Sequence, residues 1–241
     1  MIVSAHQPHY LPWIGYFNKI YLSDLFMLMD NLIYTSKGYI SKNRILTNKG
    51  WQYLTVPLIK PNGYQTKINE LLIENESQAN WRVKHLRTIK HHYEKGPGFK
   101  KFFPLLENEL MKDSLNYFDL QHNLIKSIMD YLKINTVIQL GSEKNTFGTK
   151  ENELIINILK DSNCNQMLLG IGASNNYVDK SYVTNKGYSL LRQDFNHPFY
   201  KQPYKNEIVN GLSIVDLIFN TSREEAEYIV KNCGKTIPLN E

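Results

Sequence analysis

The first thirty residues constrain the fold more than any other part of the chain. Residues 2–5 are apolar and rich in β-forming types, and the apolar residues Ile14, Phe17 and Ile20 then recur at helical spacing. Residues 25–29 form a continuous apolar run, which is typical of a strand buried on both faces. Strand, helix and buried strand in this order predict a βαβ unit with two parallel strands and a right-handed crossover.

The same alternation returns in the last third of the chain. Thr149 can cap a helix with an apolar face over residues 154–159, and residues 166–169 and 188–192 have the composition of strands. Residues 212–219 have helical spacing. We therefore predict an α/β fold, with a Rossmann-like, mostly parallel sheet.

Two segments interrupt the α/β alternation. Strand-like runs at residues 33–40 and 51–58, separated by Asn48-Lys49-Gly50, predict a β-hairpin insertion within residues 31–65. Residues 78–133 are predicted to be a helical segment, with helices at 81–93 and around 120–132. We expect one α/β domain over residues 1–241 that contains both insertions.

The end of the chain follows a helix-start motif. Ser222 and Glu225 form an S-x-x-E capping box, which predicts that the last helix begins there. The final eight residues are expected to be loose.

Composition excludes several classes of protein. The 241 residues carry a net charge of +5, which permits an anionic ligand but is too small for a nucleic-acid-coating surface. The two cysteines form no C-x-x-C motif, and no metal site is predicted. No signal peptide or membrane-spanning run is visible, so we expect a cytoplasmic protein without membrane insertion. The sequence is compatible with both a monomer and a homo-oligomer.

Ligands of parallel α/β sheets bind beyond the carboxyl ends of the strands. Three segments are predicted to meet there: residues 6–10 after the first strand, Asp30 after the second, and Gly170-Ile171-Gly172-Ala173-Ser174 after a later one. Small residues in the last segment would let backbone N–H groups face an anion. A plain tight turn is the alternative for that segment.

His6 and Gln7 are the strongest site candidates in the first segment. His6 can shuttle a proton near neutral pH, and Gln7 can donate hydrogen bonds to a phosphate or sugar. Alternatively, His6 satisfies backbone groups of its own loop. Asp30 is a candidate base or hydroxyl ligand, and a turn cap is the alternative for this residue.

The loop after the first strand also resembles the H-x-G-H loop of nucleotidyltransferases. His6 and His9 match the two histidines, but Pro8 replaces the glycine that lets a phosphate approach the backbone. This resemblance supplies a second hypothesis, nucleotidyl or other phosphoryl-group chemistry on a nucleoside triphosphate.

The helix predicted at residues 81–93 is rich in basic residues. Lys84 is its candidate ligand for a phosphate, and a solvated basic face is the alternative. The basic residues are not interleaved with aromatic platforms, so a nucleic-acid partner is not expected.

Motifs along nearly the whole chain resemble the WbqC-like family. They include H-Q-P-H-Y-L-P at 6–12, N-R at 43–44, L-T-V-P at 54–57, and segments around residues 169–170, 177–179, 200–202 and 212–217. The resemblance implies a role in bacterial surface-polysaccharide synthesis, in O-antigen or capsule clusters, with glycine or acyl transfer to an amino sugar. The positions that match the family's motifs are His6, Gln7, Tyr10, Asp30, Asn43, Arg44, Gly170, Tyr177, Asp179 and Gln202.

The leading hypothesis is a transferase that forms an amide on a nucleotide-linked amino sugar, carried by dTDP or UDP. The acyl donor would be an acyl-coenzyme A or another activated acyl group, and no other cofactor is predicted. His6 would act as the base with Asp30 as its orienter, and Arg44 would hold the pyrophosphate. The carbonyl oxygen, as it gains charge, would be held by Gln7, Asn43 or the backbone near Gly170. The nucleobase would stack on Tyr10, Tyr177 or Trp51. The remaining candidates for ligand binding are Lys84, Gly172, Ser174, Asp179 and Gln202. A non-catalytic sugar-nucleotide-binding module is a further alternative.

Overall fold

A computed structural model describes residues 1–75, 81–144, 151–172, 178–205 and 207–239. Within these residues the helices are α1 (Ile14–Tyr21), α2 (Trp81–Tyr93), α3 (Phe99–Met111), α4 (Tyr117–Tyr131), α5 (Glu151–Asp161), α7 (Lys180–Thr184), α8 (Ile214–Asn220) and α9 (Arg223–Asn232). The strands are β1 (Ile2–His6), β2 (Leu25–Leu28), β3 (Lys42–Thr47), β4 (Gly50–Thr55), β5 (Leu58–Ile59), β6 (Leu72–Ile73), β7 (Val137–Leu140), β8 (Gln166–Leu169), β9 (Ser189–Phe195) and β10 (Gly234–Pro238).

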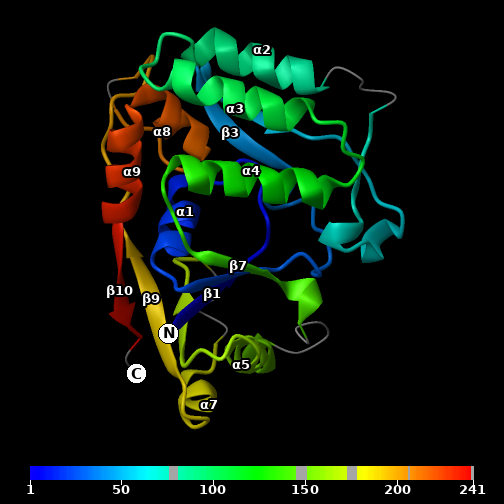
Figure 1. The fold of residues 1–241 in the computed structure, drawn as a ribbon, viewed down its shortest axis with the longest axis vertical. Coiled ribbons are helices and arrows are strands. Elements are labelled where there is room, and N and C mark those ends of the chain that lie inside the picture. The colour runs from blue at the N-terminus through cyan, green and yellow to red at the C-terminus, as the bar shows by residue number, and fades with distance from the viewer. Residues whose placement is uncertain (76–80, 145–150, 173–177, 206, 240–241) are drawn as a thin grey trace.

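One mostly parallel sheet organises the described residues, as Figure 1 shows. Its strand order is β10-β9-β8-β1-β2-β7, and only the pairing of β10 with β9 is antiparallel. The predicted parallel pairing of the first two strands is present, with Val3 opposite Leu25 and His6 opposite Leu28. The predicted α/β class and the mostly parallel sheet are therefore confirmed.

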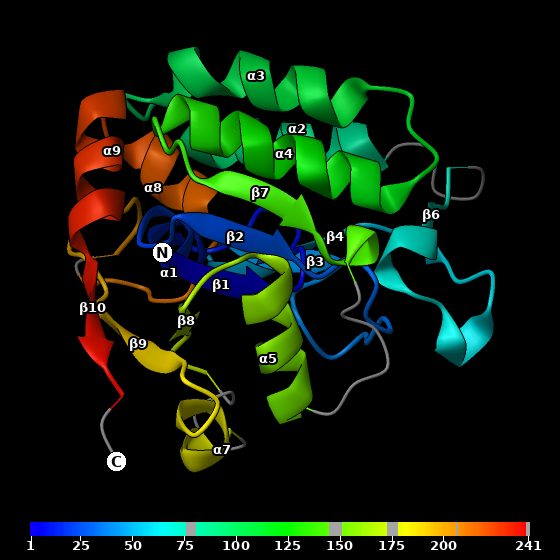
Figure 2. The same ribbon diagram turned by 60° about the horizontal axis from the view of Figure 1, so that its bottom comes forward.

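The sheet is covered on both faces, which explains its continuous apolar strands. Along β2, Phe26 and Leu28 join a core shared with α1, α4 and α8, whereas Leu25 and Met27 join a second core shared with α5. Figure 2 shows α2, α3 and α4 on one side of the sheet and α5 and α7 on the other. Alternate side chains of one strand thus enter different cores.

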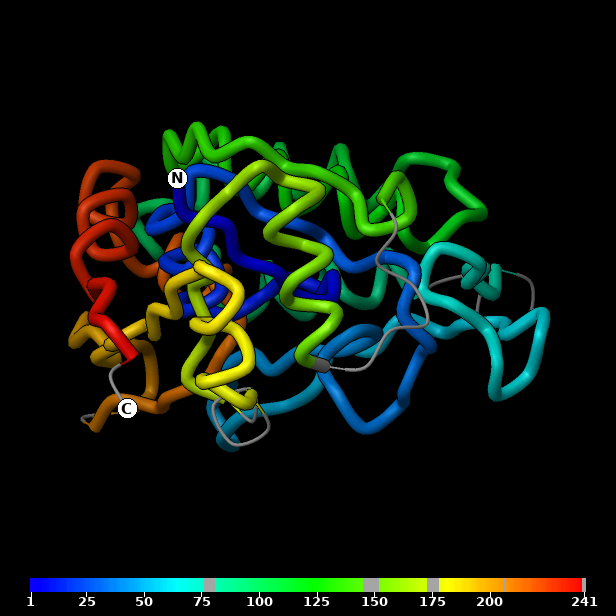
Figure 3. Tube along the Cα trace, turned by 90° about the horizontal axis from the view of Figure 1, so that it is seen from below, coloured from blue at the N-terminus to red at the C-terminus, as the bar shows by residue number. Residues whose placement is uncertain are grey.

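The order in which the chain adds strands to the sheet reverses between the parallel neighbours β1 and β8. The chain runs outward from β1 through β2 to β7, and then returns to β8 on the other side of β1. The carboxyl ends of β1 and β8 therefore border the crevice where open α/β sheets bind ligands. Seen from below in Figure 3, α5 lies across the sheet.

The helical middle contains one helix more than the sequence predicts. The predicted helices at 81–93 and around 120–132 are present as α2 and α4, but α3 lies between them and was not predicted. Pro104 inside α3 hides its helical pattern, because proline is a strong helix breaker on average. No helix among the described residues combines the length and the apolar character that a bilayer crossing requires.

The predicted hairpin is present, but the position of its first strand was wrong. The strand is β3, at Lys42–Thr47, and residues 33–40 are largely turns and irregular backbone. Thr47 pairs with Gly50, so only Asn48 and Lys49 separate the strands, and pairing must start directly before this turn. A second small antiparallel pair, β5 with β6, follows.

The expectation of a loose end was also wrong for most of the last eight residues. Gly234–Pro238 forms β10, which pairs antiparallel with β9 and covers this sheet edge. Gly234 lies against α1, since a Cβ atom here would come within 2.4 Å of Asn18 Oδ1. Residues 234–238 are ordered because they pair with the edge strand β9, and the local sequence alone does not reveal this pairing.

Candidate functional site

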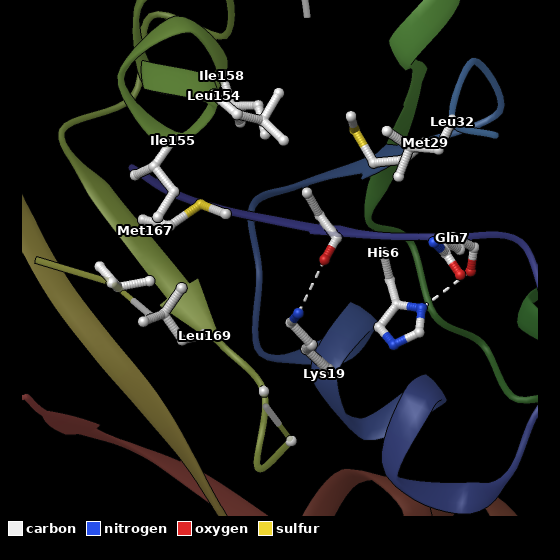
Figure 4. A pocket seen from close by; sticks show the side chains of 14 residues that line it. His6, Gln7, Lys19, Met29, Leu32, Leu154, Ile155, Ile158, Met167 and Leu169 are labelled. Carbon is white, nitrogen blue, oxygen red and sulfur yellow. Dashed lines mark hydrogen bonds between the residues drawn. The ribbon is translucent and has the colours of Figure 1, made fainter. Parts of the chain in front are cut away.

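A well-formed cavity lies at the crevice between β1 and β8. Its volume is about 490 Å³, within the usual range for small-molecule sites. It is enclosed by the ends of β1 and β8, by the chain after β2, and by α5 and α1, as seen in Figure 4. The lining residues are Ala5, His6, Gln7, Lys19, Met29, Leu32, Leu154, Ile155, Ile158, Met167, Leu169, Gly170, Gly172 and Val178.

The cavity has a polar end and an apolar remainder. The walls from α5, β8 and the residues after β2 consist of Leu, Ile and Met side chains, and they face one another across the space in Figure 4. His6, Gln7 and Lys19 provide the polar side chains. Such a space suits a ligand with one reactive polar group and a substantial apolar part.

His6 stands at the carboxyl end of β1 with its ring fixed on one side. Its Nδ1 lies 2.9 Å from the carbonyl oxygen of Gln7, and a carbonyl only accepts hydrogen bonds, so the neutral ring carries its proton on Nδ1. Burial lowers the pKa of His6 to about 4, and the nearby Lys19 cation adds to this lowering. The imidazole is therefore neutral at pH 7, and its Nε2 is the basic atom.

Lys19 is a site residue that sequence reasoning missed. It reaches from α1 to the end of β1, where Nζ donates a hydrogen bond to the carbonyl oxygen of Ala5 at 2.9 Å, drawn in Figure 4. Burial lowers the pKa of Lys19 to about 8, so the ammonium form still predominates at pH 7. The available signal was that Lys19 is the single charged residue in the eight-residue sequence of α1.

The first and third predicted segments line this cavity, but Asp30, the residue predicted after the second strand, does not. Its neighbours Met29 and Leu32 line the cavity instead. The buried carboxylate of Asp30 accepts hydrogen bonds from the Ser142 backbone at 2.8 Å and from Asn69 Nδ2 at 3.1 Å. Asp30 thus ties together the loops after β2 and β7.

The glycine segment after β8 lines the cavity through Gly170 and Gly172. A Cβ atom on Gly170 would lie 3.7 Å from Lys19 Nζ, which places this backbone beside the polar end. Ser174 and Tyr177 lie outside the described residues. Asp179 is exposed and caps α7, where its side chain accepts a hydrogen bond from the Tyr182 backbone at 3.0 Å.

Tyr10 and Asn43 are buried among protein groups. The hydroxyl of Tyr10 is 2.9 Å from Nδ1 of His85. Asn43 donates from Nδ2 to the carbonyl oxygens of Tyr10 and Leu11, at 3.2 Å and 2.8 Å. The Asn43 contacts fasten the loop after β1 onto the β3–β4 hairpin, and the Tyr10 contact fastens it onto α2.

Arg44, Lys84 and Gln202 lie away from this cavity. Arg44 lines a smaller cavity at the base of the hairpin. Lys84 is exposed on α2 beside Arg87. Gln202 is buried, and its Nε2 donates to Oδ2 of Asp216 at 2.9 Å.

His9 connects the two cavities through ring contacts. Its ring centroid lies 4.6 Å from that of His6 and 6.0 Å from that of Tyr39, a residue that lines the Arg44 cavity. His9 Nδ1 is buried and has no hydrogen-bond partner among the described residues. Burial lowers the pKa of His9 well below its ordinary value, with His6 contributing, so this ring is neutral at pH 7.

Comparisons with known proteins agree with the family resemblance of the sequence. "Uncharacterized protein Rv1507c" from Mycobacterium tuberculosis (strain ATCC 25618 / H37Rv) is 27% identical over 229 residues, which cover 94% of this chain and 96% of that protein. No solved structure matches the chain significantly. The model of the WbqC-like protein family matches residues 7–228, and the chain therefore belongs to this family.

Proposed function

We propose that this protein forms an amide by transferring an acyl group from an activated donor to the amine of a nucleotide-linked amino sugar. The observation that supports this proposal best is the pairing of a neutral histidine, His6, with a cationic lysine, Lys19, at the polar end of an otherwise apolar cavity. Acyl transfer needs both a proton acceptor and a charge that stabilises an oxyanion.

The apolar walls favour the acyl donor as the occupant of this cavity. Side chains from α5, such as Ile155 and Ile158, and from β8, such as Met167 and Leu169, would bury the hydrocarbon part of an acyl group. The reactive carbonyl would then lie at the end of β1. The donor class is an acyl-coenzyme A thioester or another activated acyl group.

His6 is assigned to proton transfer. The amine nitrogen attacks the carbonyl carbon, the bond from that carbon to the leaving group breaks, and the amine gives up a proton to Nε2 of His6. The proton then passes to the departing group, for example the thiolate of a thioester donor. The Gln7 carbonyl supports this role because it keeps the other proton on Nδ1.

Lys19 is assigned to the charge that develops on the carbonyl oxygen. Its ammonium group is held by the Ala5 carbonyl and lies beside the backbone of Gly170. A fixed cation in a largely apolar cavity stabilises an oxyanion more strongly than it would in water.

Family membership supports the choice of acceptor. The chain belongs to the WbqC-like family. The resemblance described for its sequence implies a role in the synthesis of surface polysaccharides, such as O-antigen or capsule, where sugars are activated as nucleotides. The acceptor would be an amino sugar linked to dTDP or UDP, and the reaction would take place in the cytoplasm. Lys84 and Asp179 are exposed and line neither the His6 cavity nor the Arg44 cavity.

The test is an acyl-transfer assay with matched histidine variants. The purified protein is incubated with acyl-coenzyme A donors and dTDP- or UDP-linked amino sugars, and product mass and free thiol are measured. We expect amide formation by the wild-type protein and by His91→Gln, which changes an exposed histidine on α2, and a loss of about 100-fold or more in His6→Gln. Unchanged turnover in a folded His6→Gln variant would remove His6 from the mechanism.

The contact between His6 and His9 favours nucleotidyl transfer as the second candidate function. Two histidine rings 4.6 Å apart after the first strand match the histidines of the H-x-G-H loop. Magnesium-dependent release of pyrophosphate from a nucleoside triphosphate would favour this reaction over amide formation. Tight sugar-nucleotide binding without turnover of any donor would indicate a binding module.

A further inference from the structure

We propose that the cavity around Arg44 is a second subsite, which binds the nucleoside diphosphate part of a ligand. The assignment of this nucleoside diphosphate to the amino-sugar acceptor rests on the proposed function, but nucleotide binding at the subsite can be tested separately. The subsite has a volume of about 220 Å³ and is lined by Trp13, Tyr39, Asn43, Arg44 and Gly211. These residues come from the start of α1, from strand β3 and from two loops.

The guanidinium of Arg44 is positioned but incompletely satisfied. Its Nη2 donates to the Gly211 carbonyl oxygen at 2.9 Å, whereas its Nε is buried without a hydrogen-bond partner among the described residues. None of the ion pairs between described residues involves Arg44. Arg44 lines the cavity as a permanent cation without an ion-pair partner among the described residues, so an anion in this cavity would supply that partner.

Gly211 shows how closely the protein backbone approaches this cation. The glycine has φ +69°, and a Cβ atom on it would lie 2.5 Å from Nη2 of Arg44. Only glycine therefore combines this backbone conformation with the close approach. The guanidinium is fixed in place before any ligand arrives.

Aromatic rings flank the cation and extend the subsite toward solvent. The Arg44 guanidinium lies 5.1 Å from the Trp51 ring centroid and 5.9 Å from that of Tyr39. Trp51 and Tyr53 are exposed on β4 with their centroids 5.3 Å apart, and Lys42 Nζ lies 5.0 Å from the Tyr53 centroid. Exposed rings beside cations suit a stacked nucleobase with its phosphates on the basic groups.

The row of rings relates this subsite to the proposed acyl cavity. Tyr39 contacts His9, and His9 contacts His6 at the end of β1. A ligand anchored by its diphosphate at Arg44 would have to extend past the buried His9 ring to reach His6. This arrangement assigns the two parts of the reaction to two cavities, the acyl donor to one and the nucleotide to the other.

Nucleotide titration of the full-length protein tests the inference without any acyl donor. UDP and dTDP are titrated by calorimetry and by quenching of tryptophan fluorescence, with uridine and inorganic pyrophosphate as partial ligands. We expect saturable binding that Arg44→Gln weakens about ten- to 100-fold, and that Arg44→Lys weakens less because the charge is kept. Arg87→Gln, which removes an exposed arginine beside Lys84, should leave the affinity unchanged.

A second variant keeps the test informative if Arg44→Gln does not fold. Trp51 is about half exposed, so Trp51→Leu should fold normally and bind UDP about five-fold more weakly or worse by calorimetry. Only part of the quenching should be lost, because Trp13 also lines the subsite. The inference is overturned if neither UDP nor dTDP binds, if both variants bind like the wild-type protein, or if pyrophosphate alone binds as tightly as UDP. Nucleotide binding that depends on Arg44, without acyl transfer, would reject the proposed reaction and retain this subsite.

Discussion

The Nζ atom of Lys19 lies 2.9 Å from the carbonyl oxygen of Ala5, so the last turns of α1 are fastened to the end of β1 by a buried cation. No ion pair between described residues includes Lys19. Burying a charge with one neutral partner costs folding free energy. Because the buried Lys19 ammonium costs stability and borders a cavity, we infer that it is retained for a functional role.

Lys19→Met should therefore separate stability from activity. Methionine fills a similar volume without a charge, so we expect an unfolding midpoint equal to or above that of the wild-type protein at pH 7. Acyl transfer should fall about 100-fold or more, because the oxyanion loses its cation. Thermal melts and the acyl-transfer assay check both parts, with Lys100→Met on the exposed side of α3 as the control. Full activity in Lys19→Met would contradict the role.

The pH dependence of the proposed reaction should reflect the same two groups. Because the pKa of His6 is about 4 and that of Lys19 about 8, kcat/KM should rise as pH increases through 4 and fall as it passes 8. In Lys19→Met the alkaline fall should disappear from the residual rate. The acidic limb should also move upward, since the Lys19 cation helps to lower the pKa of His6. An acidic limb that does not move would show that the two groups do not interact.

Acidification should destabilise the protein before it affects most carboxylates. Burial lowers the pKa values of His6 and His85 to about 4, and that of His9 well below its ordinary value. The unfolded chain binds these protons near pH 6.5 and the folded chain does not, so the free energy of unfolding should decrease as pH falls from about 6.5 toward 4. Urea unfolding at several pH values measures this decrease. His85→Gln should reduce its slope by about one proton.

The sequence predicted the parallel sheet well because its signals are local. Continuous apolar runs identify strands buried on both faces, and the order of the elements then restricts their connection. The sequence could not place β10, because Gly234–Pro238 becomes a strand only by pairing with β9. Segments near residues 6, 30 and 170 were expected to meet; the first and the third line the main cavity, whereas Met29 and Leu32, not Asp30, line it after β2.

The sequence predicted the positions of segments better than the directions of individual side chains. Asp30 follows β2 as expected, yet its carboxylate turns toward Asn69 and the backbone of Ser142. Arg44 was expected to hold the pyrophosphate of the ligand, and the hairpin places it in a different cavity from His6. Lys19 was overlooked because a lysine on a short helix usually points to solvent, and burial of nearly all of α1 follows only from its packing against the sheet, α9 and β10.

Gln202 offers a test that distinguishes a ligand-binding residue from a buried structural one. Its Nε2 donates to Asp216 at 2.9 Å, and its Oε1 accepts from the backbone of Val209 at 2.7 Å. Asp216 also accepts from the hydroxyls of Tyr93 and Tyr200, both at 2.7 Å, and burial still raises its pKa. Removing one of these donors leaves a buried carboxylate less well solvated.

Gln202→Leu is therefore expected to lower the free energy of unfolding by about 1–3 kcal/mol, because buried polar partners lose their hydrogen bonds. UDP affinity should stay within about two-fold of the wild-type value at temperatures where the variant is folded, since Gln202 lines neither cavity. Urea unfolding and calorimetric titration measure the two quantities. Gln65→Leu, which changes an exposed glutamine, is the matched control. Lost affinity with unchanged stability would instead assign Gln202 to ligand binding.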